Sequence, residues 1–122
     1  MSLLEEMSQK RREATSVAEE ELNEVVEKIK NAFKDWQEHD IDRSCFKMYV
    51  CWDEGVLKLE TAEDEKTEKY SVTEEIKSKK KRQIMFDNLE KKLTAEGVDV
   101  NRKDMTRNKE RGEISFLISV AE

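Results

Sequence analysis

The sequence predicts an α+β domain in which helices cover one face of an antiparallel sheet of about four strands. Two long stretches carry apolar residues at spacings of three and four, which is typical of amphipathic helices. Shorter stretches alternate apolar and polar residues, which is typical of strands with one buried face. The expected order is a long N-terminal helix, a β-hairpin, a second helix and a C-terminal β-hairpin. A chain of 122 residues is the size of one domain, so we expect residues 1–122 to form a single unit.

The first helix is predicted over residues 3–37, where the apolar stripe thickens toward the second half. A helix of that length measures roughly 50 Å, which is longer than a domain of this size needs. We therefore expect residues 1–16 to project from the domain or to mediate oligomerisation. Leu3, Leu4 and Met7 would then lie on an exposed tip, and exposed apolar clusters tend to mark interfaces. These three residues are the candidate interface of a homodimer.

The first hairpin is predicted from alternation over residues 45–52, followed by a turn and a return strand over residues 56–61. Gly55 is placed for the left-handed position of a three-residue hairpin turn. Residues 70–72 are a candidate for a short third strand.

The second helix is predicted from about Thr73 to Glu96. Its start follows from Ser71 and Glu74, which have the spacing of a capping box, and Gly97 suits the position after a helix C-terminus. The last hairpin follows, with strands predicted over residues 98–100 and 114–120.

One core is expected to join the main elements. Each of them carries a large aromatic residue on its apolar face, and these are Trp36, Trp52, Phe86 and Phe116. Their spacing in the sequence means that this core would be built from long-range contacts.

Catalytic chemistry is not indicated by any motif. His39 is the only histidine and is expected to be exposed after a helix C-terminus. Cys45 and Cys51 would lie roughly 20 Å apart on the strand face opposite Phe46, too far for a disulfide. With three glycines the chain has no phosphate-binding loop. We therefore expect no enzyme, with no catalytic residues, no metal and no cofactor.

The charge is unevenly distributed along the chain. Residues 1–75 are net acidic, whereas residues 76–112 carry 6 acidic and 12 basic residues. Lysines in the first turns of a helix oppose its macrodipole, so an anion could offset them. The candidate residues for an anionic partner are Lys79, Lys80, Lys81, Arg82, Arg107 and Arg111. An equally simple interpretation is that these bases form a solvated helix start and a polar loop.

Surface binding is the function that these patterns favour. We expect a non-enzymatic protein-interaction module, acting as a homodimer. The alternative is a nucleic-acid-binding module that uses residues 77–82 and 102–111, although the acidic pI of about 5.1 disfavours a general nucleic-acid binder. The composition, rich in Lys and Glu, indicates a phage- or mobile-element-encoded accessory or inhibitor protein that binds a host factor.

A cytoplasmic location is expected. No apolar run approaches the roughly 18 residues that would span a membrane, and residues 1–12 lack the pattern of a secretory signal. Two reduced thiols also suit a reducing compartment.

Overall fold

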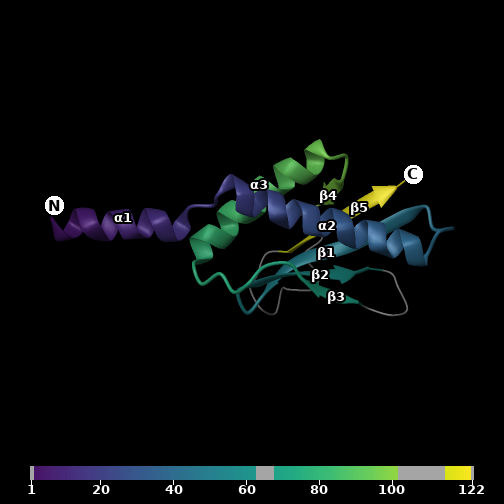
Figure 1. Cartoon of the computed structure of the whole chain (residues 1–122), viewed down its shortest axis with the longest axis horizontal. Helices are drawn as coiled ribbons and strands as arrows, with labels where there is room; N and C mark the ends of the chain where they lie inside the picture. The colour runs from purple at the N-terminus through teal and green to yellow at the C-terminus, as the bar shows by residue number, and fades with distance from the viewer. Residues whose placement is uncertain (1, 63–67, 102–114, 122) are drawn as a thin grey trace.

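The computed structural model describes residues 2–62, 68–101 and 115–121, and it has the α+β architecture that the sequence predicts (Figure 1). Five strands form one sheet in the order β3-β2-β1-β5-β4, and every neighbouring pair is antiparallel. The elements are α1 (Leu3–Thr15), α2 (Glu19–His39), β1 (Cys45–Asp53), β2 (Val56–Thr61), β3 (Lys69–Ser71), α3 (Lys79–Ala95), β4 (Asp99–Asn101) and β5 (Ser115–Ala121).

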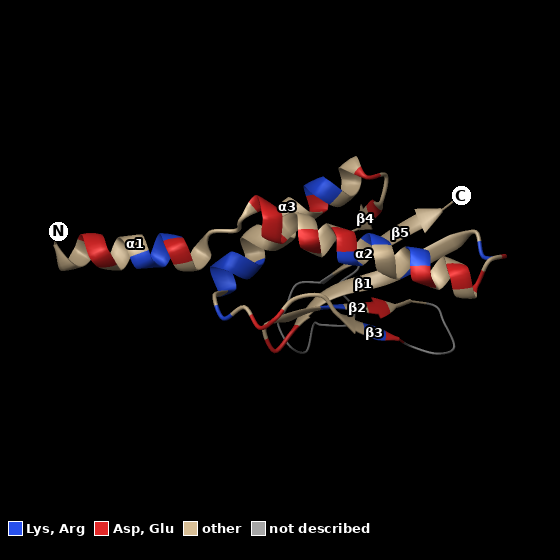
Figure 2. Cartoon of the chain, in the orientation of Figure 1, with Lys and Arg blue, Asp and Glu red and all other residues tan. Residues whose placement is uncertain are grey.

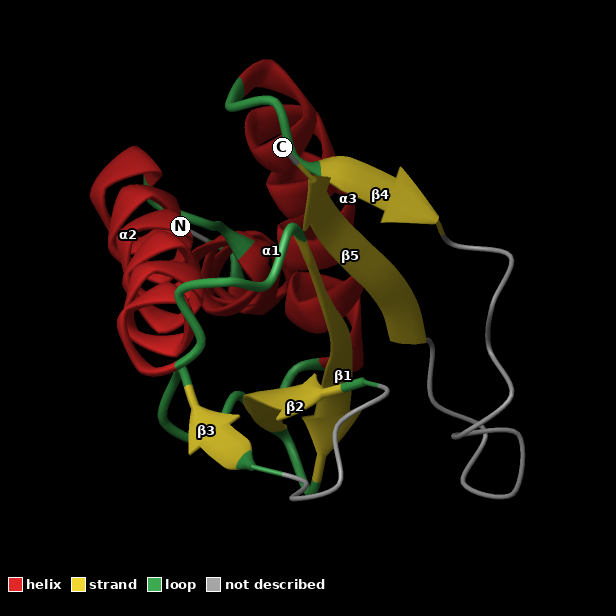
Figure 3. Ribbon diagram, turned by 90° about the vertical axis from the view of Figure 1, so that its right-hand side faces the viewer, coloured by secondary structure: helices red, strands yellow, loops and turns green. Residues whose placement is uncertain are grey.

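The side chains of the central strand β1 point alternately to the covered face and to the open face of the sheet. Its residues alternate between buried and half-buried, and Phe46, Met48, Val50 and Trp52 all point into the core. The helices α2 and α3 pack against this covered face, as Figure 3 shows. The alternation predicted from the sequence is therefore confirmed, because strand side chains point to opposite faces in turn.

The core contains all four aromatic residues that the sequence predicts for it, which confirms that expectation. Phe86 of α3 lies between two aromatic rings of the sheet, with centroids 5.5 Å from Trp52 and 4.8 Å from Phe116. Trp36 of α2 meets Phe46 edge to face at 5.1 Å. Such tilted and edge-to-face contacts add stabilisation beyond the buried area.

The N-terminal helix differs from the prediction, because it is interrupted at residues 16–18. Two hydroxyls satisfy backbone carbonyls near the end of α1, Thr15 Oγ1 donating to Arg11 O at 2.9 Å and Ser16 Oγ to Glu13 O at 3.1 Å. Such local bonds compete with a continuing helix. Val17 then packs against the core in an extended connection. The chain thus forms two helices where the apolar stripe predicts one.

Helix α3, which corresponds to the second predicted helix, begins at Lys79. This is later than the Thr73 start that the capping-box pattern predicts. The intervening segment forms no helix and is hydrogen-bonded to the first hairpin. Val72 N donates to Leu57 O at 2.8 Å, and Ile76 N donates to Gly55 O at 2.7 Å. In a helix that started near Thr73, Ile76 N would donate to Val72 O, so its bond to Gly55 O removes a donor from that helix. Ser78 becomes the N-cap instead, its Oγ accepting from Lys81 N at 3.1 Å.

Substituting the α3 cap is expected to lower the free energy of unfolding. Ser78→Ala removes an acceptor for a helix N–H group and should cost about 1 kcal/mol in urea titration. Ser2→Ala is the matched control, because Ser2 Oγ caps α1 in the same way at 3.2 Å but α1 buries no residue in the domain. The control should leave the unfolding midpoint unchanged, and equal losses in both variants would contradict this account of α3.

The first hairpin closes with two central residues, where the sequence predicts three. Asp53 pairs with Val56, and the residues between them both have positive φ, 52° at Glu54 and 80° at Gly55. Positive φ at both positions is the mark of a type I′ turn, whose twist matches that of the flanking strands.

Candidate functional site

Helix α1 projects from the rest of the protein as an arm, seen in purple in Figure 1. None of its residues is buried. Leu3, Leu4 and Met7 are 71%, 74% and 53% exposed, so the expected exposed tip is present in the structure. Glu5 and Glu6 occupy the same first turn, where negative side chains interact favourably with the positive end of the helix dipole. The tip therefore combines apolar side chains with negative charge.

The arm is connected to the domain by its C-terminal end. Helix α1 contacts α3 there, and Ala14 lines a hollow together with residues 73–78 and Lys81. Ser16 and Ala18 both have extended backbone, with ψ of 143° at each. The tip is consequently held away from the domain.

The predicted basic cluster at the start of α3 is partly engaged inside the protein. Lys81 Nζ lies 3.2 Å from Glu21 Oε1 of α2, and Figure 2 shows the basic first turn of α3 beside the acidic start of α2. Arg82 donates to Ile76 O at 2.7 Å and to Lys77 O at 3.2 Å. Lys79 and Lys80 are exposed. Glu21 therefore neutralises part of the positive charge that the lysines place at the N-terminus of α3, where the helix dipole is also positive.

The other half of the predicted anion surface, Arg107 and Arg111 with the rest of residues 102–111, lies outside the residues that the structure describes. Of the six candidate bases, Lys79, Lys80, Lys81 and Arg82 are placed on one helix turn, and the first two of these face solvent.

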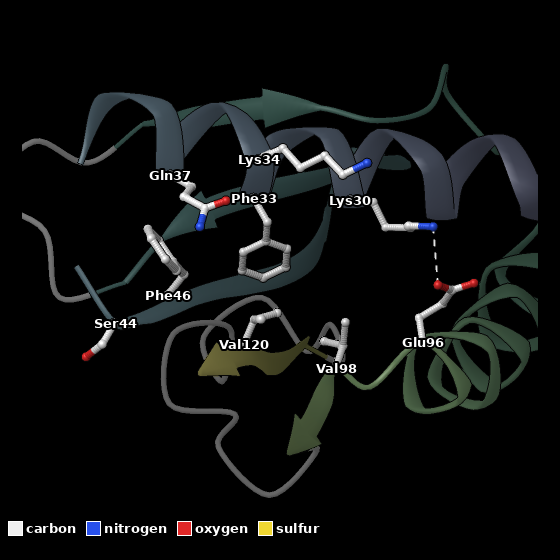
Figure 4. Close-up of a pocket in the computed structure, with 9 residues that line it drawn as sticks. All are labelled: Lys30, Phe33, Lys34, Gln37, Ser44, Phe46, Glu96, Val98 and Val120. Carbon is white, nitrogen blue, oxygen red and sulfur yellow. Dashed lines mark ion pairs between the residues drawn. The ribbon is translucent and has the colours of Figure 1, made fainter. Parts of the chain in front are cut away.

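An apolar pocket of 250 Å³ lies beside the second half of α2 (Figure 4). Its apolar wall consists of Phe33 from α2, Phe46 from β1, Val120 from β5 and Val98, which precedes β4. The side chains of Lys30, Lys34, Gln37, Ser44 and Glu96 complete the lining. The pocket forms where α2 and the end of α3 leave part of the covered sheet face between them.

One side of the pocket is closed by an ion pair between the two helical segments. Lys30 Nζ lies 3.2 Å from Glu96 Oε2 and 3.4 Å from Glu27 Oε1, and both carboxylates raise the pKa of Lys30. Lys34, exposed on the next turn of α2, makes no ion pair with any residue that the structure describes. The rim of this apolar pocket thus carries a positive charge, that of Lys34, which is available to a partner.

The residues with side chains of catalytic potential are one histidine and two cysteines. His39 is exposed at the end of α2, where Nδ1 is 2.8 Å from Asp35 O, and this carbonyl and the Asp35 charge raise its pKa. Cys45 and Cys51 are both half-buried on the open face of the sheet. Within residues 2–62, 68–101 and 115–121, no three His, Cys, Asp or Glu side chains gather as a metal site would require.

Comparison of the chain with models of protein families, with curated proteins and with solved structures found no match. Among the described segments, no helix is long and apolar enough to cross a membrane.

The pocket was missed by the reasoning from sequence. Its signal was indirect, since Phe33 widens the apolar stripe of α2 near the C-terminal end of that helix. A wide stripe predicts burial but does not say how much of it the neighbouring elements cover. The residues that line the pocket beside α2 come from segments far apart in the sequence.

Proposed function

We propose that this chain is a non-enzymatic protein-interaction module that forms a homodimer through the tip of α1. The observation that carries the proposal is the exposure of Leu3, Leu4 and Met7 on a helix that buries nothing in its own domain. Apolar side chains of this size gain about 1.5–3 kcal/mol each on full burial. A contact that covers all three side chains in both copies would favour association and offset its entropic cost.

The length of the arm supports the same proposal. An isolated helix of fewer than about 12–15 residues is marginal in water, and α1 has 13 residues with no buried side chain. Docking against a partner would stabilise the helix as well as cover its tip. A nucleic-acid role has less support, because Lys81 and Arg82 already have partners inside the protein.

Removing the apolar bulk of the tip is expected to weaken self-association. Leu4→Ala with Met7→Ala should lower the association constant of the dimer at least tenfold. Each apolar side chain that is no longer buried removes about 1.4 kcal/mol or more. Alanine is the best helix former, so loss of association would not be due to unwinding of α1. Light scattering across micromolar concentrations measures the change.

Gln9→Ala is the matched control, because it is also neutral and also lies on α1 but removes no apolar side chain from the tip. It should associate as the unmodified chain does. A chain that stays monomeric at about 100 μM, or a double variant that dimerises normally, would count against the proposal.

A further inference from the structure

The pocket beside α2 is suited in size to protein side chains. An engineered apolar cavity of about 150 Å³ holds a benzene molecule, and sites for drug-sized ligands usually measure about 300–1,000 Å³. At 250 Å³, this pocket accommodates one or two aliphatic side chains. Its wall of Phe33, Phe46, Val98 and Val120 is apolar, which favours Leu or Met as the occupant.

The charge at the rim selects among apolar occupants. Lys34 has no ion-pair partner in the described part of the chain, whereas Lys30 is already paired with Glu96 and Glu27. A partner with carboxylates beside its apolar residues would therefore be favoured, since opposite charges at a rim promote association and set its orientation. The first turn of α1 has this composition, with Glu5 and Glu6 next to Leu3, Leu4 and Met7.

The geometry of the arm matches a domain exchange between two copies. Helix α1 is roughly 20 Å long, and Phe33 lies roughly 21 Å along α2 from its first residue. A helix placed antiparallel to α2 and joined near its start would thus bring its tip to the pocket. In the structure residues 16–18 are extended, and α1 points away from the end of α2 that carries the pocket (Figure 1). The tip of the same chain is therefore out of reach.

We propose that the α1 tip of one copy docks at the pocket beside α2 of a second copy, with one or two of Leu3, Leu4 and Met7 inside the pocket and the rest against its rim. The exchange is reciprocal, so a two-fold axis relates the copies and both arms are bound, as in other dimers that swap an element. Glu5 and Glu6 of each arm then face Lys34 of the other copy. This inference rests on the proposed function and specifies what the tip binds.

A charge-swap experiment tests where the tip docks, separately from whether dimerisation requires the tip. Lys34→Glu, at an exposed position, should weaken dimerisation about tenfold, as should Glu5→Lys with Glu6→Lys, because each places like charges across two symmetric contacts. Mixing the two variants in equal amounts should restore association near the unmodified level. In that heterodimer both arms meet a rim of opposite charge. Sedimentation equilibrium at low salt reports each constant.

Lys69→Glu, a charge reversal at an exposed lysine on β3, is the matched control and should leave the dimer unchanged. If Lys34→Glu dimerises normally while Leu4→Ala with Met7→Ala does not, the arms pair with each other and the pocket assignment is overturned. Failure of the mixture to recover association would also overturn it. A monomer in which Lys34→Glu releases α1 from its own pocket would overturn the exchange between copies.

Discussion

Replacing Phe86 by alanine is expected to lower the free energy of unfolding by about 3–5 kcal/mol, the range for removing a fully buried phenyl ring. Phe86 is 1% exposed and lies between Trp52 and Phe116, so the substitution removes two ring contacts and leaves a cavity lined by rigid neighbours. The expected loss is a large fraction of the 5–15 kcal/mol that stabilises a typical domain. Urea titration followed by tryptophan fluorescence would measure it.

Ile41→Ala is the control for Phe86→Ala, because Ile41 is a large apolar residue that is 74% exposed. Its substitution should change the free energy of unfolding by less than about 0.5 kcal/mol. Comparable losses in the two variants would mean that α3 does not pack on the sheet as described.

Replacing Gly55 by alanine is expected to cost about 2–3 kcal/mol. Left-handed backbone penalises a residue with Cβ by roughly 1–2 kcal/mol, and φ at Gly55 is 80°. The added Cβ would also lie 3.1 Å from Ile76 O, a backbone atom of the segment that precedes α3, and 3.0 Å from Glu75 Cγ. Because Ile76 N donates to Gly55 O, moving that segment would strain the hydrogen bond that fixes it.

Gly97→Ala separates the two causes. Gly97 has nearly the same φ, 83°, but an added Cβ there would meet nothing within 4 Å. Its cost should be the backbone term alone, about 1 kcal/mol. Equal losses in the Gly55 and Gly97 variants, measured by urea titration, would show that the contact with the 75–76 segment is unimportant.

Both core and turn predictions concern the domain, whereas the proposed interaction concerns the arm. Because α1 buries no residue, changes at Leu4 and Met7 are expected to leave the unfolding midpoint of the monomer unaltered. Loss of assembly can therefore be measured without loss of folding, which makes the arm and the pocket rim independent targets for substitution.

The sequence by itself determined the elements whose side chains repeat with a local period. Phe46 to Trp52 alternate because successive strand residues point to opposite faces, and the stripe of α2 follows from 3.6 residues per turn. The exposure of Leu3, Leu4 and Met7 was predictable for a related reason, since the polar residues after them leave no continuous stripe to bury.

Tertiary contacts decided the boundaries and the site. Residues 72–76 carry a helix-start pattern, but hydrogen bonds to Leu57 and Gly55 tie them to the first hairpin and they form no helix. Long-range bonds of this kind have no local signature. In the sequence Lys81 cannot be told from the lysines next to it, but the packing of α2 beside α3 places its Nζ 3.2 Å from Glu21 Oε1. The pocket exists because those two helices leave part of the sheet uncovered. Local periodicity specifies which face of an element is buried, whereas the distance between elements depends on how all of them pack together.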